Sequence, residues 1–114
     1  MLVVTRFTIG DADAAGQADF VARAQTALRV LAGCKGYLRG RLARSLDEST
    51  HWLLLTEWAS VGAYRRALSS YDVKVHATPL LAQSADEPSA YEVLADADAG
   101  GEITVAISDR ADAR

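Results

Sequence analysis

The sequence predicts an α+β fold in which helices cover one face of a single antiparallel sheet. Short apolar runs of strand type alternate along the chain with segments whose apolar residues recur at helical spacing. The polar run 47–50 separates two of the strand runs and is short enough to join them as an antiparallel hairpin. A chain of 114 residues has room for one such domain with one core.

The first strand is expected at residues 2–9, which are rich in β-branched side chains and are followed by a glycine and an aspartate. Alternation places Thr5 on the same face as the apolar Val3 and Phe7. The next segment has apolar residues at helical spacing and predicts a helix that covers the sheet: Phe20, Ala24, Ala27, Leu28 and Leu31.

The second and third strands are expected at residues 36–45 and 51–58. The third contains two tryptophans and three consecutive leucines, which is typical of a strand covered on both faces. Alternation puts Leu54 and Trp58 on one face of this strand. In the second strand, Tyr37 shares a face with two arginines, so that face is expected to be wet or to meet anions.

A second helical region follows, for which Ser60 is the expected N-cap and Tyr64 belongs to the apolar face. Thr78, which precedes a proline, is expected to cap a separate helix, so this region is segmented. Residues 90–94 supply a last short strand. The resulting order of strand, helix, strand, strand, helix, strand is that of the ferredoxin-like fold, βαββαβ.

One face of such a sheet stays bare because both helical regions cover the other face. Half of the residues are hydrophobic and only 24% are charged, which is more apolar surface than a small monomer easily hides. We therefore expect a homodimer in which two sheets face one another as a dimeric α+β barrel.

The barrel domain is expected to comprise residues 1–94, followed by a C-terminal extension at 95–114. Residues 95–101 are rich in Ala, Asp and Gly and predict a flexible connector. Residues 102–107 have the β-branched pattern of an extra strand, which could join its own sheet, cross to the partner subunit or stay loose. We expect residues 109–114 to be disordered.

Charge and motif content exclude several classes of function. A net charge of -3 argues against nucleic-acid binding, and no apolar run approaches the length of a membrane span. The first residues lack the organisation of a signal peptide, so we expect a cytoplasmic protein. Cys34 is the single cysteine, and no paired His or Cys pattern predicts a metal site.

The run from Trp58 through Ser60 and Ala63 to Tyr64 resembles the antibiotic biosynthesis monooxygenase family, in which a Trp-x-Ser-x-x-Ala-aromatic pattern joins the third strand to a helix. The element order agrees over residues 2–94. The resemblance implies an oxidoreductase that needs no metal, flavin or other cofactor. Such a monooxygenase oxidises a flat aromatic substrate, for instance a polyketide anthrone, with dioxygen to a quinone.

The resemblance also implies the site. Trp58 and Tyr64 are carried over as catalytic residues that orient the substrate in a dry pocket. Leu54 stands where anthrone-oxidising members have an Asn, so we expect it to line the substrate site without supplying an amide. Thr5 and Tyr37 are expected to line the same pocket, and His76 is a candidate for proton transfer because imidazole titrates near neutral pH.

Two alternatives remain open at this point. A different subgroup of the fold binds or degrades haem through a His on the second helical region, an Asn on the first strand and a helical Trp. Here His76 lies near the His position, Thr5 replaces the Asn and residues 65–68 contain no Trp. The other alternative is a dimer that binds a small molecule without catalysis, in which Trp58 and Tyr64 serve packing alone.

Overall fold

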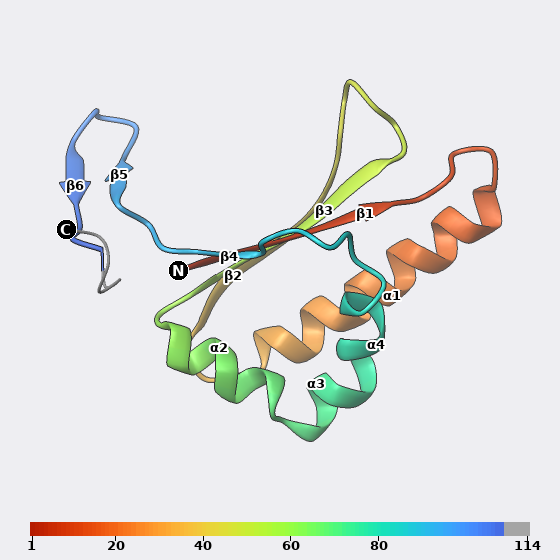
Figure 1. Cartoon of the computed structure of the whole chain (residues 1–114), viewed down its shortest axis with the longest axis horizontal. Helices are drawn as coiled ribbons and strands as arrows, with labels where there is room; N and C mark the ends of the chain where they lie inside the picture. Colours follow the sequence, from red (N-terminus) through yellow and green to blue (C-terminus); the bar gives the residue numbers. More distant parts are fainter. Residues whose placement is uncertain (109–114) are drawn as a thin grey trace.

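A four-stranded antiparallel sheet carries all of the helices on one of its faces (Figure 1). The computed structural model describes residues 1–108, so the expectation for 109–114 lies outside the described residues. The elements of the domain follow one another as β1 (Leu2–Thr8), α1 (Ala14–Ala32), β2 (Tyr37–Arg44), β3 (His51–Trp58), α2 (Val61–Leu68), α3 (Tyr71–His76), α4 (Thr78–Leu81) and β4 (Ala90–Tyr91). The predicted ferredoxin-like order is thereby confirmed.

The strands are arranged in the order β2-β3-β1-β4, with β3 and β1 at the centre. In the β1–β3 register, Thr5 lies opposite Leu54, and in the β2–β3 register Leu42 lies opposite the same leucine. The two hairpin strands β2 and β3 pair as expected, but a β-bulge between them places Tyr37 opposite Trp58 and Arg39 opposite Glu57. Tyr37 therefore lies on the inner face and, contrary to what alternation had predicted, does not share the face of the arginines. A side chain on the inner face of β3 is therefore flanked by residues from both neighbouring strands.

The core lies between the inner face of the sheet and the helices. The longest helix, α1, begins at an N-cap Asp13 whose carboxylate accepts the N–H of Gly16, and it buries one apolar stripe against the sheet. Full burial of each large apolar side chain contributes about 1.5 to 3 kcal/mol. The buried residues come from every layer and include Val3, Phe7, Phe20, Leu31, Leu54, Trp58, Val73 and Leu80.

The segmented helical region is observed as α2, α3 and α4, but the cap of the last helix differs from the expectation. Thr78 is the first residue of α4, and the N-cap position is taken by Ala77, which makes no side-chain cap bond. Ala77 already has helical dihedral angles because α3 runs directly into α4. An N-cap residue normally has extended dihedral angles, whereas the chain stays helical where α3 meets α4. Thr78 therefore does not act as the cap.

The C-terminal extension forms a separate two-stranded sheet, β5 (Ala95–Ala97) and β6 (Ile103–Val105). We expected a connector at 95–101, whereas this segment supplies a strand and a turn. The Asp98 side chain accepts the N–H groups of Gly100 and Glu102, which orders the turn. In Figure 1 this hairpin projects beyond the end of the main sheet, away from the helices.

The face of the main sheet opposite the helices is not covered by any element of residues 1–108 (Figure 1). Its centre holds the half-buried Leu53 and Leu55, and β2 borders it with the exposed Arg39 and Arg41.

None of the described helices is long and apolar enough to traverse a bilayer.

Candidate functional site between the sheet and the helices

Three aromatic rings pack together where β3 gives way to α2. The rings of Trp58 and Tyr64 have centroids 5.4 Å apart at 54°, and Tyr37 meets Trp58 edge-on at 5.4 Å. Such tilted and edge-on pairs add to the energy of burial. Trp58 contacts both tyrosine rings and is only 1% exposed, so it forms the centre of this cluster.

The local sequence explains how Tyr64 reaches the sheet. Ser60 leaves the strand in an extended conformation, and its hydroxyl accepts the N–H of Ala63, which starts α2 as predicted. Gly36, at φ +89, lies so close to α2 that a Cβ on it would collide with the Cβ of Ala63. This close approach holds the first turn of α2, and with it Tyr64, against the end of β3.

The indole N–H of Trp58 donates to the hydroxyl of Thr56 at 2.9 Å, in a bond that is buried. Both side chains lie on the inner face of β3, two positions apart. An indole has one N–H, so the group that the sequence suggested for orienting a substrate is already used inside the protein. Trp58 therefore acts in this conformation as a fixed wall behind Tyr64.

A cavity of about 110 Å³ lies beside this cluster, between β1, α2 and the segment 81–89. Thr5 and Tyr64 both line it, so the structure brings these two of the expected site residues together. Sequence reasoning missed the other side of the cavity, which is lined by Leu81, Ser84, Ala85, Glu87 and Ser89.

Burial raises the pKa of the Tyr64 phenol above its ordinary value. The phenol therefore keeps its proton at neutral pH and can donate a hydrogen bond into the cavity. Burial raises the pKa of Tyr37 as well. Ser84 lines the cavity with its hydroxyl donating to the carbonyl of Leu81 at 2.7 Å.

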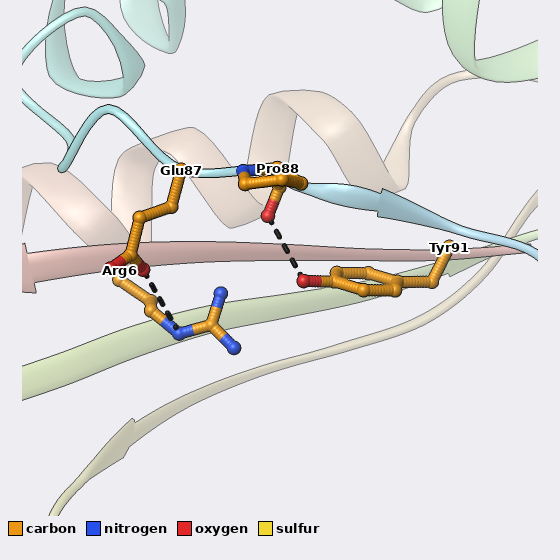
Figure 2. Close-up of polar contacts among 4 residues, drawn as sticks. All are labelled: Arg6, Glu87, Pro88 and Tyr91. Carbon is orange, nitrogen blue, oxygen red and sulfur yellow. Dashed lines mark hydrogen bonds and ion pairs between the residues drawn. The ribbon is translucent and has the colours of Figure 1, made fainter.

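The segment 85–89 is fastened to the outer edge of β1. The Ala85 N–H donates to the carbonyl of Arg6 at 2.8 Å, and the Val4 N–H donates to the carbonyl of Ser89 at 2.7 Å. Figure 2 shows the side chains that reinforce this fastening: the Arg6 guanidinium lies 3.5 Å from the Glu87 carboxylate, and the Tyr91 hydroxyl donates to the carbonyl of Pro88. This segment closes the cavity on the side away from α2.

The remaining expected residues lie outside this cavity. Leu54 is buried on the inner face of β3, between Thr5 and Leu42, and Tyr37 packs on Trp58 without lining the cavity. His76 is exposed and lines a different groove, between α1 and α4, which shares no lining residue with the cavity. A haem site built from His76 and the Thr5 position would need both residues to face one hollow, and here they do not.

No three His, Cys, Asp or Glu side chains within residues 1–108 gather closely enough to hold a metal ion. The polar groups that face the cavity are instead hydroxyls and the paired charges of Arg6 and Glu87. Hydroxyl donors can stabilise negative charge that develops on a bound oxygen atom, and they do so more strongly where water is excluded.

Comparison with known structures adds independent evidence on the family. SnoaB from Streptomyces nogalater, a cofactor-independent oxygenase, superposes with a TM-score of 0.62 at 29% identity, covering 82% of this chain and 94% of that chain. A mutant of SnoaB gives 0.61 at 30% identity, covering 74% and 82%. A conserved protein from Methanosarcina mazei Go1 gives 0.62 at 17% identity, covering 78% and 84%, which supports the fold alone.

A search of curated proteins finds no match. The family model for antibiotic biosynthesis monooxygenases matches residues 1–78, a range that includes both Trp58 and Tyr64. Together with the likeness to SnoaB, this match extends over more than half of the chain. The chain belongs to the antibiotic biosynthesis monooxygenase family.

Proposed function

We propose that this protein is a cofactor-independent monooxygenase that oxidises a flat, acidic aromatic substrate of the anthrone type to a quinone. The observation that carries the proposal is the half-buried phenol of Tyr64, which lines the cavity beside Thr5 and packs on Trp58. Family membership and the likeness to SnoaB, itself a cofactor-independent oxygenase, support the reaction class.

The substrate supplies the electrons in this reaction. Transfer of a proton from its acidic CH₂ group to a base of the solvent leaves a carbanion whose charge is spread over the rings and the carbonyl oxygen. The carbanion reduces dioxygen and combines with it to give a peroxide at the same carbon. Cleavage of the O–O bond with loss of the second hydrogen then gives the quinone carbonyl, and the other oxygen atom leaves as water.

The protein's contribution is to bind and stabilise the anion. Tyr64 donates a hydrogen bond to the oxyanion, and Thr5 is a second hydroxyl at the cavity wall. Trp58, fixed by its bond to Thr56, keeps the phenol in place by packing against its ring. His76 faces a separate groove and therefore takes no part in proton transfer at this cavity of the same subunit.

Substrate entry requires the cavity to widen. Its volume of about 110 Å³ is well below the roughly 300 Å³ at which pockets for drug-sized ligands begin. The segment 85–89 is the wall that can move, because it is held to β1 by an exposed ion pair and by hydrogen bonds at its edge. Exposed ion pairs contribute at most about 1 kcal/mol, so the ion pair adds little to the cost of opening.

The working unit in this proposal is a homodimer in which the bare sheet faces of two copies meet. Leu53 and Leu55 supply the apolar centre of that face, and Arg39 and Glu57, opposite one another in the β2–β3 register, supply charges at its border. Sedimentation equilibrium at micromolar concentration should report a dimer. A stable monomer would contradict this part of the proposal.

The test of the reaction is oxygen uptake by protein freed of metal with a chelator, using anthrone as the substrate. We expect catalysed uptake with formation of anthraquinone, and a fall in kcat of about a hundredfold in Tyr64→Phe, because one donor to the oxyanion is lost. The matched control is Tyr71→Phe, since Tyr71 is 77% exposed on α3 and outside the cavity. Binding of anthrone without uptake would instead favour a non-catalytic binding protein.

A further inference from the structure

A groove in the helix layer collects positive charge away from the Tyr64 cavity. It has a volume of about 510 Å³ and lies between the C-terminal end of α1, the loop that follows it, α2 and the start of α3. Three cationic side chains line it: Arg29 from α1, Lys35 from the loop and Arg66 from α2. The groove shares no lining residue with the Tyr64 cavity, so the reaction proposed above does not use it.

The helix ends explain part of this charge. Arg29 and Arg66 lie in the last turns of α1 and α2, where a cation interacts favourably with the helix dipole. That interaction does not require the two helix ends to share a groove, and Lys35 belongs to neither helix. Within residues 1–108 none of the three cations forms an ion pair, although they line the same hollow. An anion bound between them would relieve their mutual repulsion.

The balance of charge around the groove favours a doubly charged anion. Asp72 is the only acidic residue in the lining, and it makes no ion pair with the cations, so an excess of two positive charges remains. A phosphate monoester carries about −1.5 to −2 charge at pH 7 and has three acceptor oxygens. Arginine can bind such a group through two parallel N–H bonds, which a carboxylate or sulfonate would match with only a single charge.

The half-buried part of the groove supplies one more donor and an apolar wall. The Ser70 hydroxyl accepts the N–H of Val73, which leaves its own hydrogen free to donate to a ligand. The thiol of Cys34 donates to the carbonyl of Val30 at 3.4 Å, and these two side chains line the groove together with Ala67. An ester can bury an apolar group against this wall, whereas the free phosphate ion cannot.

We propose that this groove binds a phosphate monoester of an apolar group, with the phosphate held between Arg29, Lys35 and Arg66. The helices lie on the sheet face opposite the bare one (Figure 1), so a dimer formed through the bare face leaves the groove open. The ligand links the end of α1 to α2 and therefore raises the melting temperature of the folded chain. The site is independent of the proposed oxygenation.

Isothermal titration calorimetry of the full chain with phenyl phosphate tests the site, at a constant ionic strength of about 0.15 M. We expect a Kd below about 1 mM. Arg66→Gln should weaken binding about tenfold, because it removes a charged partner of the phosphate. The matched control is Arg65→Gln, which removes the neighbouring charge of α2 that does not line the groove and should leave Kd within about twofold.

Two further probes identify the part of the ligand that is recognised. Benzenesulfonate has the same ring with a single negative charge and should bind about tenfold more weakly than phenyl phosphate. Inorganic phosphate has the charge without the ring and should also bind several-fold more weakly. Equal binding of benzenesulfonate would overturn the assignment to a phosphate, and equal binding of inorganic phosphate would overturn the apolar part of the ligand.

The result that would overturn the site itself is a chain whose cations are only a solvated surface. In that case phenyl phosphate at about 10 mM would give neither binding heat nor a rise in melting temperature, or Arg66→Gln and Arg65→Gln would weaken binding equally. Neither outcome alters the separate test of oxygen uptake, because the groove and the Tyr64 cavity have no residue in common.

Discussion

The aromatic corner around Trp58 and the C-terminal hairpin are both rich in large apolar side chains, but they bury them to opposite degrees. Trp58 is 1% exposed, whereas Ile103 and Ile107 are 65% and 94% exposed. The corner is stabilised by contacts within one chain, and its rings are held in one arrangement. The hairpin gains little from its apolar residues until another surface covers them. The difference separates apolar side chains that the single chain buries from apolar side chains that it leaves exposed to solvent.

The largest effect expected from this contrast is on stability. Trp58→Ala should lower the free energy of unfolding by about 3 to 5 kcal/mol, because it leaves a large cavity and an unpaired Thr56 hydroxyl in the core. Ile103→Ala should change it by no more than about 0.5 kcal/mol in the monomer, because the residue is exposed there. Urea unfolding followed by far-UV circular dichroism at low protein concentration measures both. Equal losses of unfolding free energy in the two variants would contradict the difference in burial between the two regions.

A smaller loss is expected where β2 begins beneath α2. Gly36→Ala should destabilise the protein by about 2 to 4 kcal/mol, since it combines a left-handed backbone conformation with a collision against Ala63. Gly10→Ala is the matched control, because a Cβ there has no neighbouring atom within 4 Å. If thermal unfolding shows the two variants alike, the close packing of α2 on this turn is not what positions Tyr64.

The pH dependence of stability should also come from the corner. The pKa of Tyr64 is raised by burial, so the folded chain holds the phenol proton more tightly than the unfolded chain does. This contribution is fully present below about pH 10, where the unfolded phenol begins to ionise, and is lost as the pH rises through the folded pKa. The hairpin strands β5 and β6 contain no tyrosine. Urea midpoints at about pH 9 and pH 11 should therefore fall less in Tyr64→Phe than in the wild type; an equal fall would show that Tyr64 does not titrate in the way its burial implies.

The smallest effect is expected at the segment that closes the cavity. Glu87→Gln removes the ion pair with Arg6 (Figure 2), and both partners are about half exposed, so the free energy of unfolding should fall by less than about 1 kcal/mol. Local opening should nevertheless increase, which limited proteolysis between residues 81 and 89 would detect. Asp86→Asn, one position away and without an ion pair in the described chain, is the control. Cleavage that is equally slow in both variants would mean that the backbone bonds alone hold the segment.

The sequence was sufficient for the elements with strong periodic patterns. The two tryptophans and three leucines of β3 predicted a strand covered on both faces; the strand is observed, but within residues 1–108 only its inner face is buried. The Ser60 cap set the start of α2. Those two features together placed Tyr64 against Trp58. The hydrogen bond from Trp58 to Thr56 could also have been predicted, because residues two apart in a strand share a face. The family motif instead favoured a hydrogen bond from the indole to a substrate.

The parts of the site that sequence reasoning missed depend on contacts between distant segments. Nothing in the polar run 84–89 marks it as a cavity wall, since its position comes from hydrogen bonds to β1, about 80 residues earlier in the chain. His76 drew attention as a titratable group, but its place on the outer side of α3 is decided by how α3 packs against α1. Only one strand of the hairpin was predicted from the sequence. β6 has a strand composition, whereas β5 is built from alanine and aspartate and is stabilised by its pairing with β6.

We propose that this chain inserts one atom of dioxygen into an aromatic substrate at the Tyr64 cavity without a cofactor. Turnover of anthrone under ¹⁸O₂ by chelator-treated protein tests it most directly, with mass spectrometry of the quinone as the readout. We predict one ¹⁸O atom in each quinone and a rate that falls in Tyr64→Phe but not in Tyr71→Phe. An unlabelled product, or a labelled product formed equally fast by Tyr64→Phe, would contradict it.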